Sequence, residues 1–139
     1  MERRKVERVL VAYDGSEGAR RALELVPELA PGREVTLLGV AEGVPLVGHS
    51  GTLPSAEEEA ERARQLAEAA GWLADRGIAC RTVERRGDAA TAILEQAEQD
   101  GVDLVVMGTR GLSTGQRWLL GSVSTKVLHH ASCSVLVAR

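Results

Sequence analysis

The segment RVLVAYDGSEGARRALELV, residues 8–26, changes its structural period within a few residues. Its first part is a run of apolar, partly β-branched residues, which predicts a buried strand over 8–14. Asp14-Gly15-Ser16 then predicts a sharp turn, and Ser16 is a suitable N-cap for a helix. Apolar side chains recur after it at helical spacing, at Ala19, Ala22, Leu23 and Val26. A strand followed by a turn and a helix is the repeating unit of an α/β fold.

The same alternation continues along the chain. Further strands are predicted over 34–40, 78–85, 103–108 and 134–138. Further helices are predicted after Ser55, which opens an S-x-x-E capping box, after Asp88, and over 122–131. This alternation predicts one α/β domain over 1–139, with a parallel sheet that has helices on both faces.

Two details of the helices are also predicted. Pro27 is expected to kink or shorten the first helix, and Pro31-Gly32 to end it. The helix after Ser55 is expected to bury a stripe that consists mainly of alanines, namely Ala56, Ala60, Ala63, Ala67, Ala70 and Leu73.

Length and composition restrict the class of protein. The chain has 139 residues, of which 44% are apolar, enough for a buried core. No run of about 18 apolar residues occurs, so we expect no membrane-spanning helix. The apolar stretch near the start is shorter than the roughly 7–15 residues of a signal peptide, which predicts a cytoplasmic protein. Aromatic residues make up 2%, which argues against binding single-stranded nucleic acid by base stacking. Cys80 and Cys133 are isolated, so we expect reduced thiols that pack in the interior.

Charge is unevenly distributed along the chain. Residues 1–103 carry 13 basic and 20 acidic side chains, a net charge of −7. Residues 104–139 carry no acidic side chain and four basic ones. This asymmetry indicates a local anion site late in the chain rather than a surface for polyanions.

The stretch GTRGLSTGQRWLLGS, residues 108–122, gathers glycines, hydroxyls and arginines after a predicted strand. A glycine-rich turn between a strand and a helix lets backbone N–H groups converge on an anion, and the helix adds its positive end. The amides of residues 121–124 are expected to point at one spot, with the hydroxyls of Ser122 and Ser124 beside them. Glycine is expected here because it tolerates a positive φ and the close approach of a phosphate. The alternative is a glycine-rich connector that only turns the chain. Neither a Walker A sequence nor a G-x-G-x-x-G fingerprint is present.

The spacing Gly108-x2-Gly111-x9-Gly121-Ser122 resembles the ATP-binding signature of the universal stress protein family, G-x2-G-x9-G-[ST], at every fixed position. The stretches VAYDGSEGARRAL, DLVVMGTRG and SCSVLVAR are also similar to the family, so the resemblance covers Arg8 to Arg139. It implies an open, Rossmann-like, five-stranded parallel sheet of order 3-2-1-4-5. It also implies the subgroup that binds ATP. From its coordination chemistry, Mg²⁺ is expected to arrive with the nucleotide, held by phosphates, waters and a serine hydroxyl.

The resemblance implies a role for individual residues. The carboxylate of Asp14 is expected near the nucleoside, and Ala12 and Val40 are expected to line the adenine pocket. Met107 and Gly108 are expected beside the ribose. The remaining residues are expected to form the phosphate loop: Arg110 and Gly111 at its start, and Gly121, Ser122, Val123 and Ser124 in its closing half.

Several of these residues also have a purely structural interpretation. Asp14 can cap the turn through its own backbone. Val40 and Met107 can be ordinary core residues at strand ends, and Arg110 and Arg117 can be solvated loop charges. Arg117 matches no fixed position of the family. A packing role, which pins the loop to the domain, is expected for Trp118, Leu119 and Leu120.

These features favour a binding protein over a catalyst. ATP hydrolysis needs a group that orients water, and Asp14 is the only acidic residue expected near the pocket. His129 and His130 are adjacent on a predicted helix, so their side chains diverge by about 100° and do not readily share a metal. His49 lies in a segment, 41–54, that is expected to form a mobile flap, and it approaches a ligand only if that flap closes. We therefore expect an ATP-binding regulatory protein of the universal stress response. The alternatives are a slow or partner-activated ATPase, or an interaction module that binds AMP or a cyclic adenine nucleotide.

The last predicted strand, SVLVA over 134–138, is apolar and contains no proline. An unprotected edge strand of this kind pairs readily with another chain. The resemblance implies a homodimer through this strand.

Overall fold

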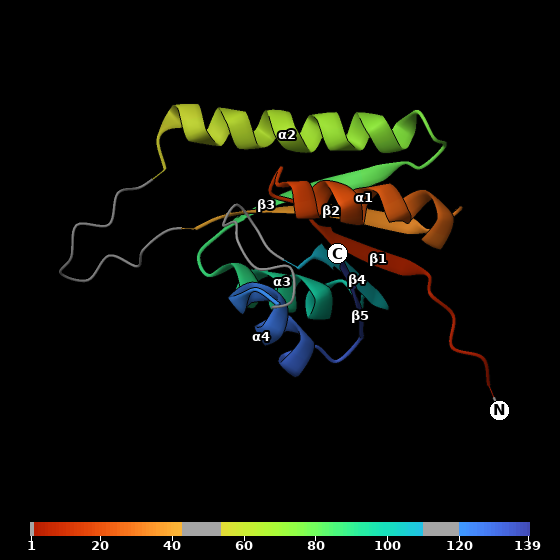
Figure 1. Ribbon diagram of the computed structural model, residues 1–139. Coiled ribbons are helices and arrows are strands. Elements are labelled where there is room, and N and C mark those ends of the chain that lie inside the picture. Colours follow the sequence, from red (N-terminus) through yellow and green to blue (C-terminus); the bar gives the residue numbers. More distant parts are fainter. Residues whose placement is uncertain (1, 43–53, 110–119) are drawn as a thin grey trace.

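The computed structural model describes residues 2–42, 54–109 and 120–139. Strands and helices alternate along the chain (Figure 1). The strands are β1 Arg8–Ala12, β2 Glu34–Ala41, β3 Cys80–Arg86, β4 Leu104–Gly108 and β5 Ser134–Ala138. The helices are α1 Glu17–Leu29, α2 Ala56–Ala74, α3 Ala89–Gln99 and α4 Ser122–His130. Each element lies where the sequence predicts it, with ends shifted by about one or two residues.

All five strands belong to one parallel sheet of order β3-β2-β1-β4-β5. At its centre, Val11 of β1 lies opposite Leu37 of β2 and Val106 of β4. The chain runs outward from β1 to β3 and then returns to the other side of β1 for β4 and β5. The strand order that the family resemblance implies is therefore confirmed.

Helices cover both faces of the sheet, α1 and α2 on one and α3 and α4 on the other (Figure 1). Successive residues of β1 point to opposite faces. Val9 and Val11 join the apolar cluster under α1 and α2, whereas Leu10 joins the cluster under α3 and α4. All three side chains are at most 1% exposed. Burial on both faces explains why the central strands are continuously apolar.

Three helices begin at the N-caps that the sequence predicts. The hydroxyl of Ser16 accepts a hydrogen bond from the backbone N–H of Ala19 at 3.2 Å. Ser55 and Glu58 form the reciprocal capping box, with distances of 3.1 Å and 2.7 Å. Asp88 caps α3 through its carboxylate. The starts of these three helices are therefore set by short-range hydrogen bonds.

Helix α1 differs from its prediction at Pro27. The helix continues past this residue to Leu29, so the prediction that Pro27 shortens it is wrong. A proline near the last turn removes one backbone hydrogen bond. Val26 and Ala30, on either side of it, are fully buried, and this burial offsets the local cost. The predicted stop at Pro31-Gly32 is confirmed.

Helix α2 buries a different face from the predicted one. Leu66, Ala69 and Leu73 are buried, whereas most of the predicted alanine stripe is exposed, namely Ala56, Ala60, Ala63 and Ala67. Leucine buries more apolar area than alanine, so the two leucines decide the rotation of the helix. Neither α2 nor any other helix within the described ranges is long and apolar enough to cross a membrane.

Candidate functional site

The predicted site lies at the carboxyl ends of β1 and β4, where the strand order reverses. Ligands of open α/β sheets bind in the crevice at this switch point. Gly108, the last residue of β4, packs against the first turn of α1. A Cβ added at Gly108 would lie 2.5 Å from the carbonyl carbon of Gly18. The turn that carries Asp14 and the end of β4 are therefore close together.

Thr109 joins the end of β4 to the start of α4. Its carbonyl oxygen accepts the N–H of Gly121 at 2.7 Å, and its own N–H donates to Ala138 in β5 at 3.0 Å. Residues 110–119 lie outside the described ranges. The hydrogen bond between Thr109 and Gly121 joins the described segments on either side of them. Gly108 and Gly121 of the glycine motif are thus brought together. No sequence signal marks Thr109, because it acts only through backbone groups.

Among the described residues, the backbone N–H groups that open α4 have no hydrogen-bond partner. Gly121 is the N-cap and has no side chain to bond them, and no acidic residue lies in the first turn. By contrast, α1, α2 and α3 each begin with a side-chain cap. The N–H groups of residues 122–124 have no partner within the helix and lie at its positive end. This end of α4 is suited to an anion.

Apolar surface lies next to this anion-binding turn. Met107 is buried in the cluster under α3 and α4, and Ala12, Val40 and Val123 pack against the same cluster while remaining partly exposed. Ala12 and Val40 are at or near the carboxyl ends of β1 and β2. The structure therefore assembles the predicted apolar residues into one group, with a half-exposed rim on which a flat ring can pack.

Asp14 has the structural role that the sequence left open. Its Oδ1 accepts the N–H of Ser16 at 2.9 Å, which closes the turn before α1. The residue is exposed, and its other carboxylate oxygen makes no hydrogen bond to the described residues. One oxygen thus remains available for a ligand hydroxyl or amine.

The positive φ expected of the motif glycines is wrong for Gly108 and Gly121. Gly121 has φ −67° and ψ 165°, and Gly108 is not among the glycines with positive φ. Gly108 is instead required by its contact with Gly18, because any side chain would enter the backbone of α1. Positive φ occurs earlier at this edge, at Gly15 with φ 77°.

Ser124 also differs from its prediction. Its side chain is buried, and its Oγ lies 3.0 Å from the carbonyl oxygens of both Thr109 and Gly121. The hydroxyl therefore donates to the protein's own backbone and not to a ligand, while the N–H of Ser124 remains part of the open turn. Ser122, in contrast, is exposed.

The other predicted residues fall into two groups. Leu120 is 40% exposed, so the packing role expected for it is wrong. The remaining ones lie outside the described residues: Arg110, Gly111, Arg117, Trp118, Leu119 and, in the predicted flap, His49.

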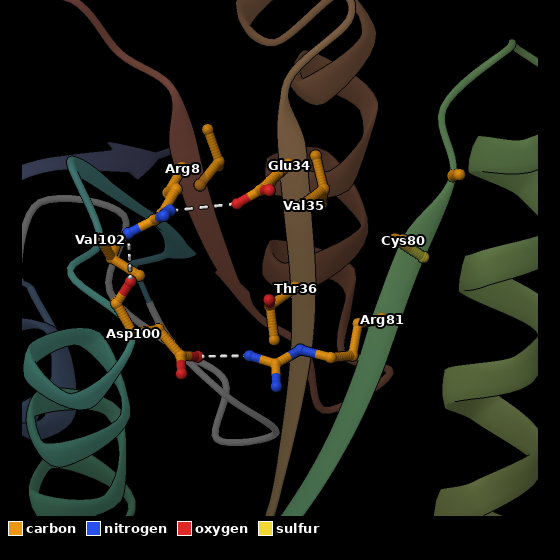
Figure 2. A pocket seen from close by; sticks show the side chains of 10 residues that line it. Arg8, Glu34, Val35, Thr36, Cys80, Arg81, Asp100 and Val102 are labelled. Atoms are coloured by element: carbon orange, nitrogen blue, oxygen red, sulfur yellow. Dashed lines mark hydrogen bonds and ion pairs between the residues drawn. The ribbon is translucent and has the colours of Figure 1, made fainter.

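The opposite end of the sheet contains a hollow of about 570 Å³ (Figure 2). Arg8 pairs with Glu34 at 3.0 Å, and Arg81 reaches across β2 to pair with Asp100 at 2.6 Å. The guanidinium of Arg8 also donates to the carbonyl oxygen of Asp100 at 3.3 Å. Each of these charges therefore has a partner, as expected of a network that holds strands and α3 together.

The described ranges contain no group of three metal-ligating side chains. Cys80 and Cys133 are free and half-buried, and burial raises the pKa of both thiols. They have the environment of packing thiols, as predicted.

The sequence profile of the universal stress protein family matches residues 5–139. The chain belongs to the universal stress protein family. Two relatives extend this membership over nearly full length. A universal stress protein encoded in the 3' region of a QAH/OAS sulfhydrylase in Thermus aquaticus is 36% identical, over 94% of this chain and 97% of its own. Universal stress protein YxiE of Bacillus subtilis is 31% identical, over 95% and 98%.

Solved universal stress proteins have the same fold. UspA from Lactobacillus plantarum superposes with a TM-score of 0.80 at 22% identity, covering 99% of this chain and 100% of that one. A universal stress protein from Archaeoglobus fulgidus, solved in complex with dAMP, gives 0.73 at 21% identity, with 97% and 98% covered. Another, solved in complex with cAMP, gives 0.69 at 22% identity, with 96% and 97% covered.

Proposed function

We propose that this universal stress protein binds an adenine nucleotide, ATP foremost, at the edge between β1 and β4, and that it acts as a regulatory binding protein in the cytoplasm during stress. The observation that carries the proposal is the start of α4. Its N–H groups at residues 122–124 lack a side-chain cap and lie at the base of the glycine motif. Three converging N–H groups and the positive end of a helix stabilise a phosphate without a lysine.

The surrounding residues match the remaining parts of a nucleotide. Ala12 and Val40 present a partly exposed apolar rim to the base. The free carboxylate oxygen of Asp14 is assigned to a ribose hydroxyl, next to Met107 and Gly108. Arg110 and Gly111, which complete the motif, are assigned to the outer phosphates, where a guanidinium suits a phosphate oxygen.

The choice of ATP over a monophosphate rests on the complete motif. The complexes with dAMP and cAMP belong to those two relatives. They make AMP and cAMP the natural competitors in a binding test. Mg²⁺ is assigned to the bound phosphates and water, because it usually keeps several waters and takes few protein ligands.

Binding without rapid turnover is the proposed activity. The described residues place one acidic side chain, Asp14, at this edge of β1, and one of its oxygens closes the turn. The hydroxyl of Ser124 is likewise engaged by backbone carbonyls. Neither group is arranged to deprotonate a water molecule for attack on a phosphate.

Isothermal titration of the purified protein with ATP, AMP and cAMP, each with and without Mg²⁺, tests this function. Saturable binding with ATP as the tightest ligand is expected. Absence of binding to all three at millimolar concentration would contradict the proposal, and tighter binding of AMP or cAMP would replace ATP as the ligand.

Gly121→Val provides the matched test of the α4 site. The backbone of Gly121 is in the β region, which valine adopts readily, so the circular dichroism spectrum should be retained. The isopropyl group occupies the space in front of the helix amides, and nucleotide binding should be abolished. Unchanged affinity in a folded variant would remove the anion site from α4.

We also propose a homodimer that forms through β5. This strand lies at an edge of the sheet, and Val135, Leu136 and Val137 are only half-buried. An edge of this kind is stabilised by pairing with a second copy. Sedimentation velocity should show a dimer, and Leu136→Lys should shift it toward monomer.

A further inference from the structure

Helix α2 contacts the carboxyl end of the sheet through its N-terminal half. Glu59 pairs with Arg86 at the end of β3. Leu66 lies against β2, where a Cβ added at Gly39 would be 2.9 Å from Leu66 Cδ1. Gln65, which directly precedes Leu66 in α2, reaches the turn between β1 and α1. Helix α2 therefore spans the edge from β3 to the turn that carries Asp14.

The contact between Gln65 and Gly15 is close. A Cβ added at Gly15 would lie 2.8 Å from both Cδ and Oε1 of Gln65, and 3.0 Å from Nε2. The whole carboxamide therefore lies against the Cα of Gly15. The Nε2 group also donates to Glu61 Oε1 at 3.3 Å, which restrains the amide from its own helix. Gly15 has φ 77°, so a residue with a side chain would be strained there, and its Cβ would displace the end of the Gln65 side chain.

The turn is thus held from two directions. On one side, the carboxylate of Asp14 accepts the N–H of Ser16, and Ser16 is buried as the cap of α1. On the other, Gln65 of α2 supports Gly15. Asp14 is itself exposed, so its orientation depends on the turn and not on packing around its own side chain.

We propose that Gln65 is a positioning residue that fixes the orientation of Asp14 and couples helix α2 to nucleotide occupancy. The inference rests on the proposed nucleotide site and adds a second element that responds to it. A nucleotide held by Asp14 stabilises the turn, the turn stabilises Gln65, and Gln65 stabilises the N-terminal half of α2. Coupling between the two is reciprocal, so the factor by which bound nucleotide strengthens the Gln65 contact is also the factor by which loss of that contact weakens nucleotide binding.

The test compares the wild type with Gln65→Ala, Gln65→Met and Gln99→Ala. Gln99 is exposed at the end of α3, so its variant removes the same amide far from the turn. Affinity is measured by isothermal titration, and amide hydrogen exchange over 56–66 is measured with and without nucleotide. Gln65→Ala should weaken binding about threefold to tenfold and abolish the nucleotide-dependent protection of α2. Gln65→Met, which keeps the length of the side chain, should restore most of both, and Gln99→Ala should match the wild type.

The outcomes separate this proposal from the function on which it rests. If the wild type binds no nucleotide, the proposed function fails first. If the wild type binds and Gln65→Ala shows the same affinity and the same protection of α2, the positioning role is overturned. It is also overturned if Gln65→Met restores nothing, since the amide then acts on the ligand directly.

Discussion

The two ends of the parallel sheet treat polar groups differently. At the amino end, Asp103 accepts the N–H groups of Glu7 and Arg8, each at 2.9 Å. Arg81 and Asp100 form an ion pair beside it, so the polar groups there satisfy one another. At the carboxyl end, the N–H groups that open α4 have no partner within the helix. Groups that pair with each other stabilise the fold, whereas groups left open mark the place for a ligand.

Gly108→Ala tests whether the carboxyl end also contributes to stability, and it should have the largest effect. The added methyl group would lie 2.5 Å from the backbone of Gly18, so α1 must move away from β4. Chemical denaturation should show a loss of about 2–3 kcal/mol in the free energy of unfolding. A variant as stable as the wild type would show that the contact between α1 and β4 is loose, and would return Gly108 to a purely ligand-related role.

Gly121→Asp places a side-chain cap at the open end of α4. An aspartate at this N-cap bonds the free amides and complements the helix dipole, so the free energy of unfolding should rise by about 0.5 kcal/mol. The same carboxylate repels a phosphate, and nucleotide affinity should fall at least about tenfold, or ~1.4 kcal/mol. Thermal denaturation and isothermal titration on one sample measure both effects. If stability and affinity moved in the same direction, the amides would not be the shared partner.

Asp103→Asn removes a satisfied carboxylate at the amino end. The N–H groups of Glu7 and Arg8 hold the pKa of Asp103 below its usual value. Its contribution to stability is therefore complete above about pH 4 and is lost as the pH falls through the lowered pKa of the folded state. The variant should be about 1 kcal/mol less stable at pH 7, with a weaker dependence on acid. Equal stability of the two proteins at pH 7 would count against this role, and unchanged nucleotide affinity is the expected control.

Arg81→Gln should have the smallest effect. The guanidinium is mostly exposed, with 59% of the side chain accessible, and exposed ion pairs contribute little. A loss of about 0.5 kcal/mol is expected, which should diminish further at high salt. Denaturation at low and high ionic strength measures it. A weakened nucleotide affinity in this variant would show that the two ends of the sheet are coupled, and would contradict a purely structural role for the amino end.

Short-range patterns predicted most of the fold and much of the candidate site. The continuous apolar runs identified the central strands, because a strand between two helical layers is buried on both faces. Ser16, Ser55 and Asp88 marked helix starts, because a cap bonds an N–H only three residues away. The glycine spacing pointed to the start of α4, and the fold brings Gly108 and Gly121 together through Thr109.

Contacts between distant segments could not be predicted in this way. The rotation of α2 depends on how Leu66 and Leu73 meet the sheet. The need for glycine at position 108 depends on the approach of Gly18, and the orientation of the Asp14 turn depends on its contact with Gln65. The sequence alone determined which elements form and where they begin, because those choices rest on neighbours within about one helical turn. Only the tertiary structure decided which faces and side chains meet, because such contacts join residues far apart along the chain, and spacing carries no information about them.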